Sequence, residues 1–88
     1  METQIRSRVV KKPEICGGSP TIEGTRIRIM DIVEEYEFLG TPPEEIAEEF
    51  GISLAQVFSA LAYYHENREE IQEEIKGHKE FVKKLMHG

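Results

Sequence analysis

The 88-residue sequence predicts a mainly α fold: a three-helix core of helix-turn-helix type with a short N-terminal β-arm and a C-terminal helical extension. Three observations lead to this prediction. After residue 29, apolar residues recur at the three- and four-residue steps of amphipathic helices. Glycines and capping residues divide that part of the chain into separate helices. The residues before it alternate with the period of a strand.

Residues 1–29 are predicted to form the β-arm. Short strands are expected at 5–10, 21–22 and 26–29. In the last of these, alternation places Ile27 and Ile29 toward the core and Arg26 and Arg28 on the outer face. The glycines of the arm match neither a phosphate-binding loop nor a dinucleotide fingerprint, because a strand and not a helix follows them, so we interpret them as turn residues.

Residues 30–76 are predicted to form the core of a single domain. Its three helices are expected at 29–39, 42–50 and 54–76. Gly40 and Gly51 should end the first two, since glycine readily adopts the left-handed conformation found at helix C-termini. Gly77 should end the third, and residues 77–88 should form a short amphipathic tail.

Capping residues define where the second and third helices begin. Thr41 is expected to cap the second helix through its hydroxyl, with Pro42 at the first helical position and Glu44 completing a capping box. Ser53 and Gln56 form a similar Ser-x-x-Gln box before the third helix. The turn between these two helices is about three residues long and contains glycine, which is typical of a helix-turn-helix unit.

Charge is unevenly distributed along the chain. Residues 1–30 contain six basic and three acidic residues, whereas residues 31–88 contain five basic and fourteen acidic ones. This asymmetry indicates either a basic segment for an anionic partner on an otherwise acidic body, or the arginines that short solvated strands often collect.

Composition argues against several classes of protein. No apolar run approaches the ~20 residues of a membrane span, and the charged start lacks the apolar segment of a secretory signal, so we expect a cytoplasmic protein without a membrane partner. Cys16 is the single cysteine, which excludes an intramolecular disulfide and a thiolate metal cage, and we expect no metal or cofactor. An enzyme is not expected; one that uses Cys16 stays as a third alternative.

The third helix is the expected recognition element. Gln56, Ser59 and Tyr63 share its polar side and would face the major groove of DNA. Residues 51–65 contain no charged side chain, which disfavours DNA because phosphate pairing dominates affinity. In one interpretation the arm supplies the positive charge. The protein would then be a homodimer, held together by the apolar seam of the third helix, and both subunits would contribute their arms. The basic residues of the arm are Lys11, Lys12, Arg26 and Arg28. In the other, the uncharged surface binds a protein.

Four motifs follow one another within residues 13–64: Gly18-Ser19-Pro20, Gly24-Thr25-Arg26-Ile27, Glu44-Glu45-Ile46 and Ala60-Leu61-Ala62-Tyr63. In this order they resemble the family of the domain of unknown function 433 (DUF433). Arg28 departs from the family pattern, which usually has proline after the Gly-Thr-Arg-Ile motif, and the link at Gly51 is shorter than in many members. The resemblance implies a homeodomain-like or winged helix-turn-helix fold and an antitoxin paired with a toxin of the PIN-ribonuclease type.

We therefore expect a dimeric, non-catalytic antitoxin or transcription regulator that binds operator DNA, a PIN-type toxin, or both. The alternative is a protein-interaction module that binds a partner without touching DNA. The tail supplies four apolar side chains that could anchor it in a toxin groove, or could pack on the first helix or a second subunit; they are Phe81, Val82, Leu85 and Met86.

Overall fold

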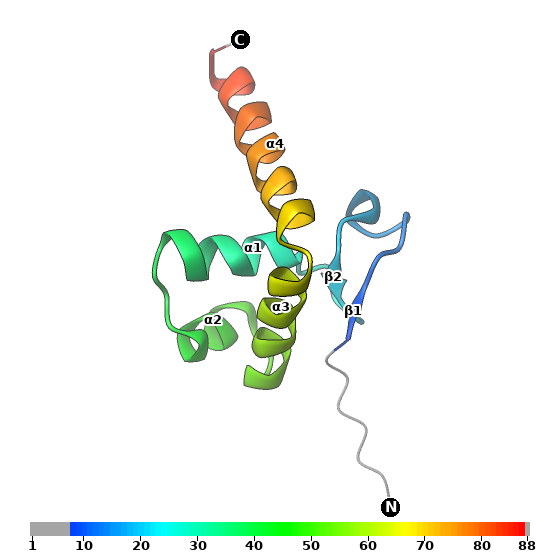
Figure 1. Ribbon diagram of the computed structural model, residues 1–88, viewed down its shortest axis with the longest axis vertical. Helices are drawn as coiled ribbons and strands as arrows, with labels where there is room; N and C mark the ends of the chain where they lie inside the picture. Colours follow the sequence, from blue (N-terminus) through cyan, green and yellow to red (C-terminus); the bar gives the residue numbers. More distant parts are fainter. Residues whose placement is uncertain (1–7, 88) are drawn as a thin grey trace, which may run out of the picture.

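The computed structural model describes residues 8–87 as a mainly helical chain with one small sheet (Figure 1). The helices are α1 (Ile29–Val33), α2 (Pro43–Phe50), α3 (Leu54–Glu66) and α4 (Arg68–His87). α1 continues directly into a π-helical stretch, η2 (Glu34–Phe38). The far half of α4 projects from the body, so the molecule is elongated, with extents of 56 × 29 × 23 Å.

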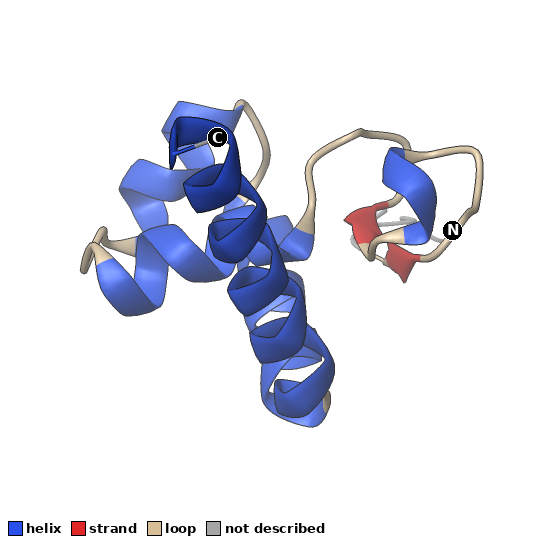
Figure 2. Cartoon of the chain, turned by 90° about the horizontal axis from the view of Figure 1, so that it is seen from above, coloured by secondary structure: helices blue, strands red, loops and turns tan. Residues whose placement is uncertain are grey.

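The N-terminal arm is an antiparallel ribbon that lies to one side of the helices (Figure 2). Its strand β1 (Val9–Val10) pairs with β2 (Thr21–Ile22), with Val9 opposite Ile22 and Val10 opposite Thr21. A single 3-10 turn, η1 (Cys16–Gly18), lies in the connection between the two strands. The first expected strand is thus confirmed at its end, whereas residues 5–7 lie outside the described part of the chain.

The third expected strand, at 26–29, is confirmed at one residue only. Only Arg28 forms an isolated bridge, to Thr21, and Ile29 already begins α1. A tight turn precedes it and is held by Thr25, whose hydroxyl donates to the carbonyl of Ile22 and accepts from the backbone N–H of Ile27. The inward position expected for the two isoleucines is nevertheless observed, since Ile29 is fully buried and Ile27 packs on the core.

The apolar core lies where α1 meets α3 and α4, with α2 packed on α3. All four helices and β2 contribute to it, so the elements share one core. Its buried apolar residues are Ile22, Ile29, Met30, Ile32, Val33, Ile46, Ala47, Val57, Ala60, Leu61, Tyr64, Ile71 and Ile75.

The capping box before α3 is confirmed. The N–H of Gln56 donates to Ser53 Oγ at 3.1 Å, and the N–H of Ser53 donates to Gln56 Oε1 at 2.8 Å. Gly51 ends α2 in the left-handed conformation, with a φ of 71°. These two local signals fix the short link between α2 and α3.

The cap expected for α2 is wrong by one residue. Pro42 is the residue before the helix, in an extended conformation, and Pro43 takes the first helical position. Proline disfavours the α conformation of the residue before it, so Pro43 prevents Pro42 from joining the helix. The Thr41 hydroxyl consequently donates to Glu35 Oε1 at 3.0 Å instead of capping α2, and no capping box with Glu44 forms.

The single long helix expected at 54–76 is two helices, because the chain breaks at Asn67. Its backbone leaves the helical region (φ −137°, ψ 46°), and its side-chain Nδ2 donates to the carbonyl of Tyr63 at 3.0 Å. Asparagine competes in this way with helical backbone bonds, and its own carbonyl then accepts from Ile71 as α4 begins. In one long helix, three- and four-residue steps would place Arg68 on the apolar seam; after the break Arg68 is exposed.

The helix end expected at Gly77 is likewise wrong. Gly77 lies inside α4, which continues to His87. The surrounding lysines and glutamates are good helix formers, and a single exposed glycine costs only about 1 kcal/mol relative to alanine. The segment that the pattern set apart as a tail is therefore the second half of one rigid helix.

Replacing Gly77 and Gly51 by alanine should have opposite effects. A Cβ would meet nothing within 4 Å at either position, so backbone conformation alone decides. Gly77→Ala should raise the free energy of unfolding by about 0.5–1 kcal/mol and increase helicity. Gly51→Ala, at a positive φ, should lower it by about 1–2 kcal/mol. Urea denaturation followed by circular dichroism measures both, and destabilisation by Gly77→Ala would contradict a continuous α4.

Candidate functional site

Two of the three α3 side chains that were expected to face DNA are held by contacts within the chain. The Tyr63 hydroxyl donates to Glu70 Oε1 of α4 at 2.7 Å. Gln56 is bound in the capping box, and Ser59 is half-buried. The polar side of α3 is thus partly covered by α4 and is less available than its sequence indicates.

Lys11 of the arm joins the same contact. Its Nζ donates to Glu70 Oε2 at 2.6 Å, so Glu70 connects the arm, α3 and α4. The hydrogen bond from Lys11 lowers the pKa of Glu70, and the same bond raises the pKa of Lys11. Burial, followed by the bond to Glu70, raises the pKa of Tyr63 to about 12.

Arg28 is also paired within the chain. Its Nε and Nη2 donate to the two carboxylate oxygens of Asp31 at 2.9 and 3.2 Å, a bidentate pair at the start of α1. Two of the four expected phosphate ligands, Lys11 and Arg28, are therefore neutralised by carboxylates. Lys12 and Arg26 are exposed, and neither forms an ion pair within residues 8–87.

The exposed face of α3 is uncharged and largely apolar. Phe58 is 51% exposed, and Leu54 is also exposed. Ala55 and Ala62 lie one turn before and after Phe58 on the same exposed stripe. None of these side chains carries a hydrogen-bond donor for a base edge or a phosphate, so this face suits protein better than DNA.

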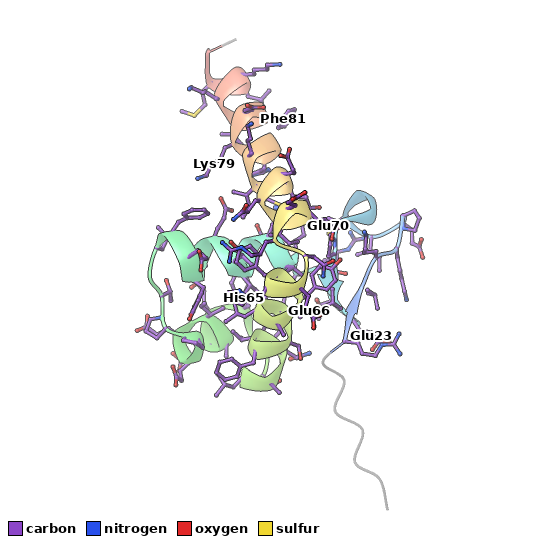
Figure 3. All side chains as sticks on the ribbon, viewed as in Figure 1. Glu23, His65, Glu66, Glu70, Lys79 and Phe81 are labelled. Carbon is purple, nitrogen blue, oxygen red and sulfur yellow. The ribbon has the colours of Figure 1, made fainter. Side chains whose placement is uncertain are left out.

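The far half of α4 exposes a second apolar surface, which we call the α4 end. It continues the helix face that Ile71 and Ile75 bury in the core. Figure 3 shows Phe81 far out along α4, whereas Glu70 lies near its root beside α3. The four side chains expected to contact a partner make up this surface and are 60, 38, 67 and 79% exposed: Phe81, Val82, Leu85 and Met86.

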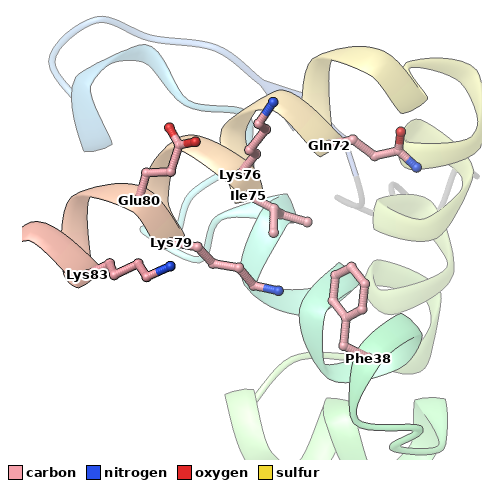
Figure 4. A pocket seen from close by; sticks show the side chains of 7 residues that line it. All are labelled: Phe38, Gln72, Ile75, Lys76, Lys79, Glu80 and Lys83. Carbon is pink, nitrogen blue, oxygen red and sulfur yellow. The ribbon is translucent and has the colours of Figure 1, made fainter.

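Two hollows flank the ring of Phe38, which is 58% exposed at the end of η2. Lys79 Nζ lies over this ring, 4.4 Å from its centroid, and lines both hollows. The first, of about 390 Å³, lies between Phe38 and α4 (Figure 4), and its wall includes Lys76 and Lys83. The lysines on α4 make this hollow predominantly basic.

The second hollow, of about 430 Å³, is acidic. Its apolar floor combines Phe38 with two further side chains, Leu39 and Phe50. Its carboxylates are Asp31, Glu34 and Glu35. We call this site the acidic hollow. The sequence analysis missed the acidic hollow because Phe38 falls outside the apolar stripe of its helix. The presence of this aromatic residue within an acidic stretch was the one feature of the sequence that could have indicated the hollow.

Cys16, the residue of the enzyme alternative, contacts a backbone carbonyl. Cys16 Sγ lies 3.5 Å from the carbonyl oxygen of Arg26, to which it donates. Within residues 8–87, no three His, Cys, Asp or Glu side chains gather closely enough to hold a metal ion. Over the same residues, no helix combines the length and apolarity needed to cross a membrane.

Comparison with known proteins identifies a family and a related structure. The model of the family described as "Protein of unknown function (DUF433)" matches residues 9–64. A crystal structure of a DUF433 member protein from Anabaena variabilis is 30% identical, with a TM-score of 0.72 over 81% of this chain and 70% of that one. The search of curated proteins found no match.

Removal of the Tyr63 hydroxyl tests the contact at Glu70. Tyr63→Phe should lower the free energy of unfolding at neutral pH by about 0.5–1 kcal/mol, a small value because the pair is partly solvated. A lowered pKa means that the contribution of ionised Glu70 is present above its ordinary value of 4.5 and disappears as the pH falls through the lowered value. The difference between Tyr63→Phe and wild type should therefore shrink in acid.

Urea denaturation at a series of pH values provides the measurement, with Tyr36→Phe as the matched control because Tyr36 is an exposed tyrosine. A deficit for Tyr63→Phe that is equal at neutral and acidic pH would show that Glu70 does not receive this hydrogen bond.

Proposed function

The chain belongs to the DUF433 family, and we propose that it is the antitoxin of a toxin–antitoxin pair: a non-catalytic, cytoplasmic protein that binds a partner protein through the α4 end. The resemblance of its motifs implies a PIN-type ribonuclease as the partner. The single observation that supports protein binding most strongly is the exposure of four neighbouring apolar side chains on a projecting helix.

Apolar side chains that stay in water contribute no burial energy to a small protein, so their exposure here suggests a binding role. Contiguous apolar patches on soluble proteins commonly mark interaction sites. Phe81 and Leu85 lie one turn apart, as do Val82 and Met86, which is the spacing by which an amphipathic helix fills an apolar groove. Since α4 is already helical, it loses little conformational entropy when it binds.

Operator binding is a second candidate, supported by a different observation. The α2–α3 pair, with its short link at Gly51, has the order of elements of a helix-turn-helix unit. Lys12 and Arg26 are exposed on the arm and could pair with phosphates. Base reading by α3 has less support, because Tyr63 and Gln56 are engaged within the chain. The geometry therefore favours a protein partner over sequence-specific DNA recognition.

Removal of apolar side chains from the α4 end should strongly weaken toxin binding. Phe81→Ala/Leu85→Ala removes two apolar anchors, and we expect the Kd for the PIN-type ribonuclease of the same genome to rise at least about 100-fold. Lys84→Ala is the matched control: it alters the same segment outside the apolar stripe and should change the Kd less than about threefold. Isothermal titration with the purified ribonuclease gives both values.

Inhibition of the ribonuclease by the full chain should follow the same order of variants. Unchanged binding by Phe81→Ala/Leu85→Ala would place the contact elsewhere on the chain. Absence of any binding or inhibition by the wild-type chain would contradict the antitoxin proposal itself.

DNA binding, if it contributes, should depend on the arm. Arg26→Ala and Lys12→Ala should each weaken binding to the region upstream of the gene and reduce the slope of log K against log salt by about 0.9 for each phosphate that is no longer neutralised. Lys84→Ala, which removes a basic residue at the other end of the molecule, should leave the slope unchanged. Fluorescence anisotropy at several salt concentrations measures this, and no wild-type binding at low salt would eliminate the DNA role.

A further inference from the structure

The acidic hollow and the α4 end have opposite charge. Residues 31–50, which form the hollow and its surroundings, contain eight acidic residues and no basic one. Residues 81–86, which form the α4 end, contain two lysines and no acidic residue. Each surface also combines its charges with exposed apolar side chains, so the two are complementary in polarity as well as in charge.

The acidic side lacks enough counter-charge within its own chain. Glu35, which lines the hollow, also interacts with Glu49 of α2, whose pKa is raised by burial and then by the charge of Glu35. Lys79 is the only basic side chain that lines the acidic hollow in the described chain, and it lies over Phe38. Leu39, at 71% exposure, leaves the apolar floor open to a further side chain.

The α4 end matches this hollow in the arrangement of its side chains. Its apolar stripe includes Leu85 and Met86, and Lys83 and Lys84 flank the stripe on its two sides, as the helical period requires. A helix laid in the hollow would therefore place apolar side chains on the floor and ammonium groups at the carboxylates Glu34 and Glu35.

The α4 end cannot reach the acidic hollow of its own chain. α4 is one continuous helix, and Ile71 and Ile75 fix its root in the core. Leu85 lies about 15 Å further along the axis than Ile75, at 1.5 Å per residue. Figure 1 shows this half of α4 leading away from the body and from α2. An α4 end that occupies the hollow must therefore come from another molecule.

We propose that a second copy of this chain occupies the acidic hollow: two copies form a two-fold dimer in which each α4 end lies on the acidic hollow of the other. A two-fold axis repeats the contact, so both α4 ends and both hollows are covered at once. This dimer uses the same α4 end that the proposed toxin contact uses, and its formation needs no toxin. The toxin and the second copy accordingly compete for the α4 end.

Charge reversal on each side separately tests the proposal with the full chain alone. Lys83→Glu/Lys84→Glu makes the α4 end acidic, and Glu34→Lys/Glu35→Lys makes the hollow basic. Each variant alone should raise the dimer dissociation constant at least about tenfold, because like charges then meet. An equimolar mixture should restore dimerisation as a heterodimer, since both of its contacts again join opposite charges.

Analytical ultracentrifugation measures the three samples, and circular dichroism checks that each variant is folded. Because Glu35 accepts a hydrogen bond from Thr41, Leu39→Ser serves as a second hollow variant that alters only an exposed side chain. It should also weaken the dimer. Glu69→Lys, an exposed charge reversal near the root of α4, is the control and should not.

A monomeric wild type, or a mixture of the two reversal variants that fails to dimerise, would overturn the proposal. A dimer joined through two α4 ends would survive Glu34→Lys/Glu35→Lys, and a dimer joined through the Phe58 face of α3 would survive every variant; either result also overturns it. Toxin binding gives an independent readout, because Leu39→Ser should not weaken it, whereas Phe81→Ala/Leu85→Ala should. Failure of the dimer and failure of the antitoxin role are therefore distinguishable.

Discussion

The packing of Ile71 and Ile75 against the core determines what the rest of the molecule can do. These two side chains are buried, and α4 contacts α1 through this part of the helix bundle. Because α4 continues without a break beyond Ile75, burial at its root also fixes the direction of its far half. The α4 end is therefore exposed because a core contact sets the direction of the helix. Since the helix is continuous, it holds this end rigidly. An apolar surface presented in this way is pre-organised for a partner.

The contact at Glu70 supports the same arrangement. Glu70 accepts from Lys11 of the arm and from Tyr63 of α3, so it joins three segments at the root of α4. Lys11, which the sequence analysis assigned to an anionic partner, instead pairs with a carboxylate of its own chain. Arg28 does the same with Asp31. The basic character of the arm is consequently smaller in the folded protein than its composition indicates. The basic charge that stays on the surface includes the lysines of the α4 end.

Local signals in the sequence predicted much of the fold. The Ser53–Gln56 capping box and the left-handed Gly51 depend on neighbouring residues, and both are confirmed. The break at Asn67 was missed because the apolar period continues across it, although Arg68 within that seam was a warning. The partners of Lys11 and Tyr63 could not be predicted, since the Lys11–Glu70 pair spans 59 residues and depends on the direction α4 takes after the break. The residues of the α4 end were predicted, but their placement on one long helix was not.

Isotope-filtered NOE spectroscopy on a mixture of labelled and unlabelled chains tests most directly whether α4 presents its apolar end to another molecule. The account predicts helical chemical shifts through residues 78–86 and NOEs from the methyl groups of Leu85 to Leu39 only between different chains. NOEs between Leu85 and Leu39 within a single chain, with non-helical shifts near Gly77, would show that the segment folds back on its own body and would contradict the account.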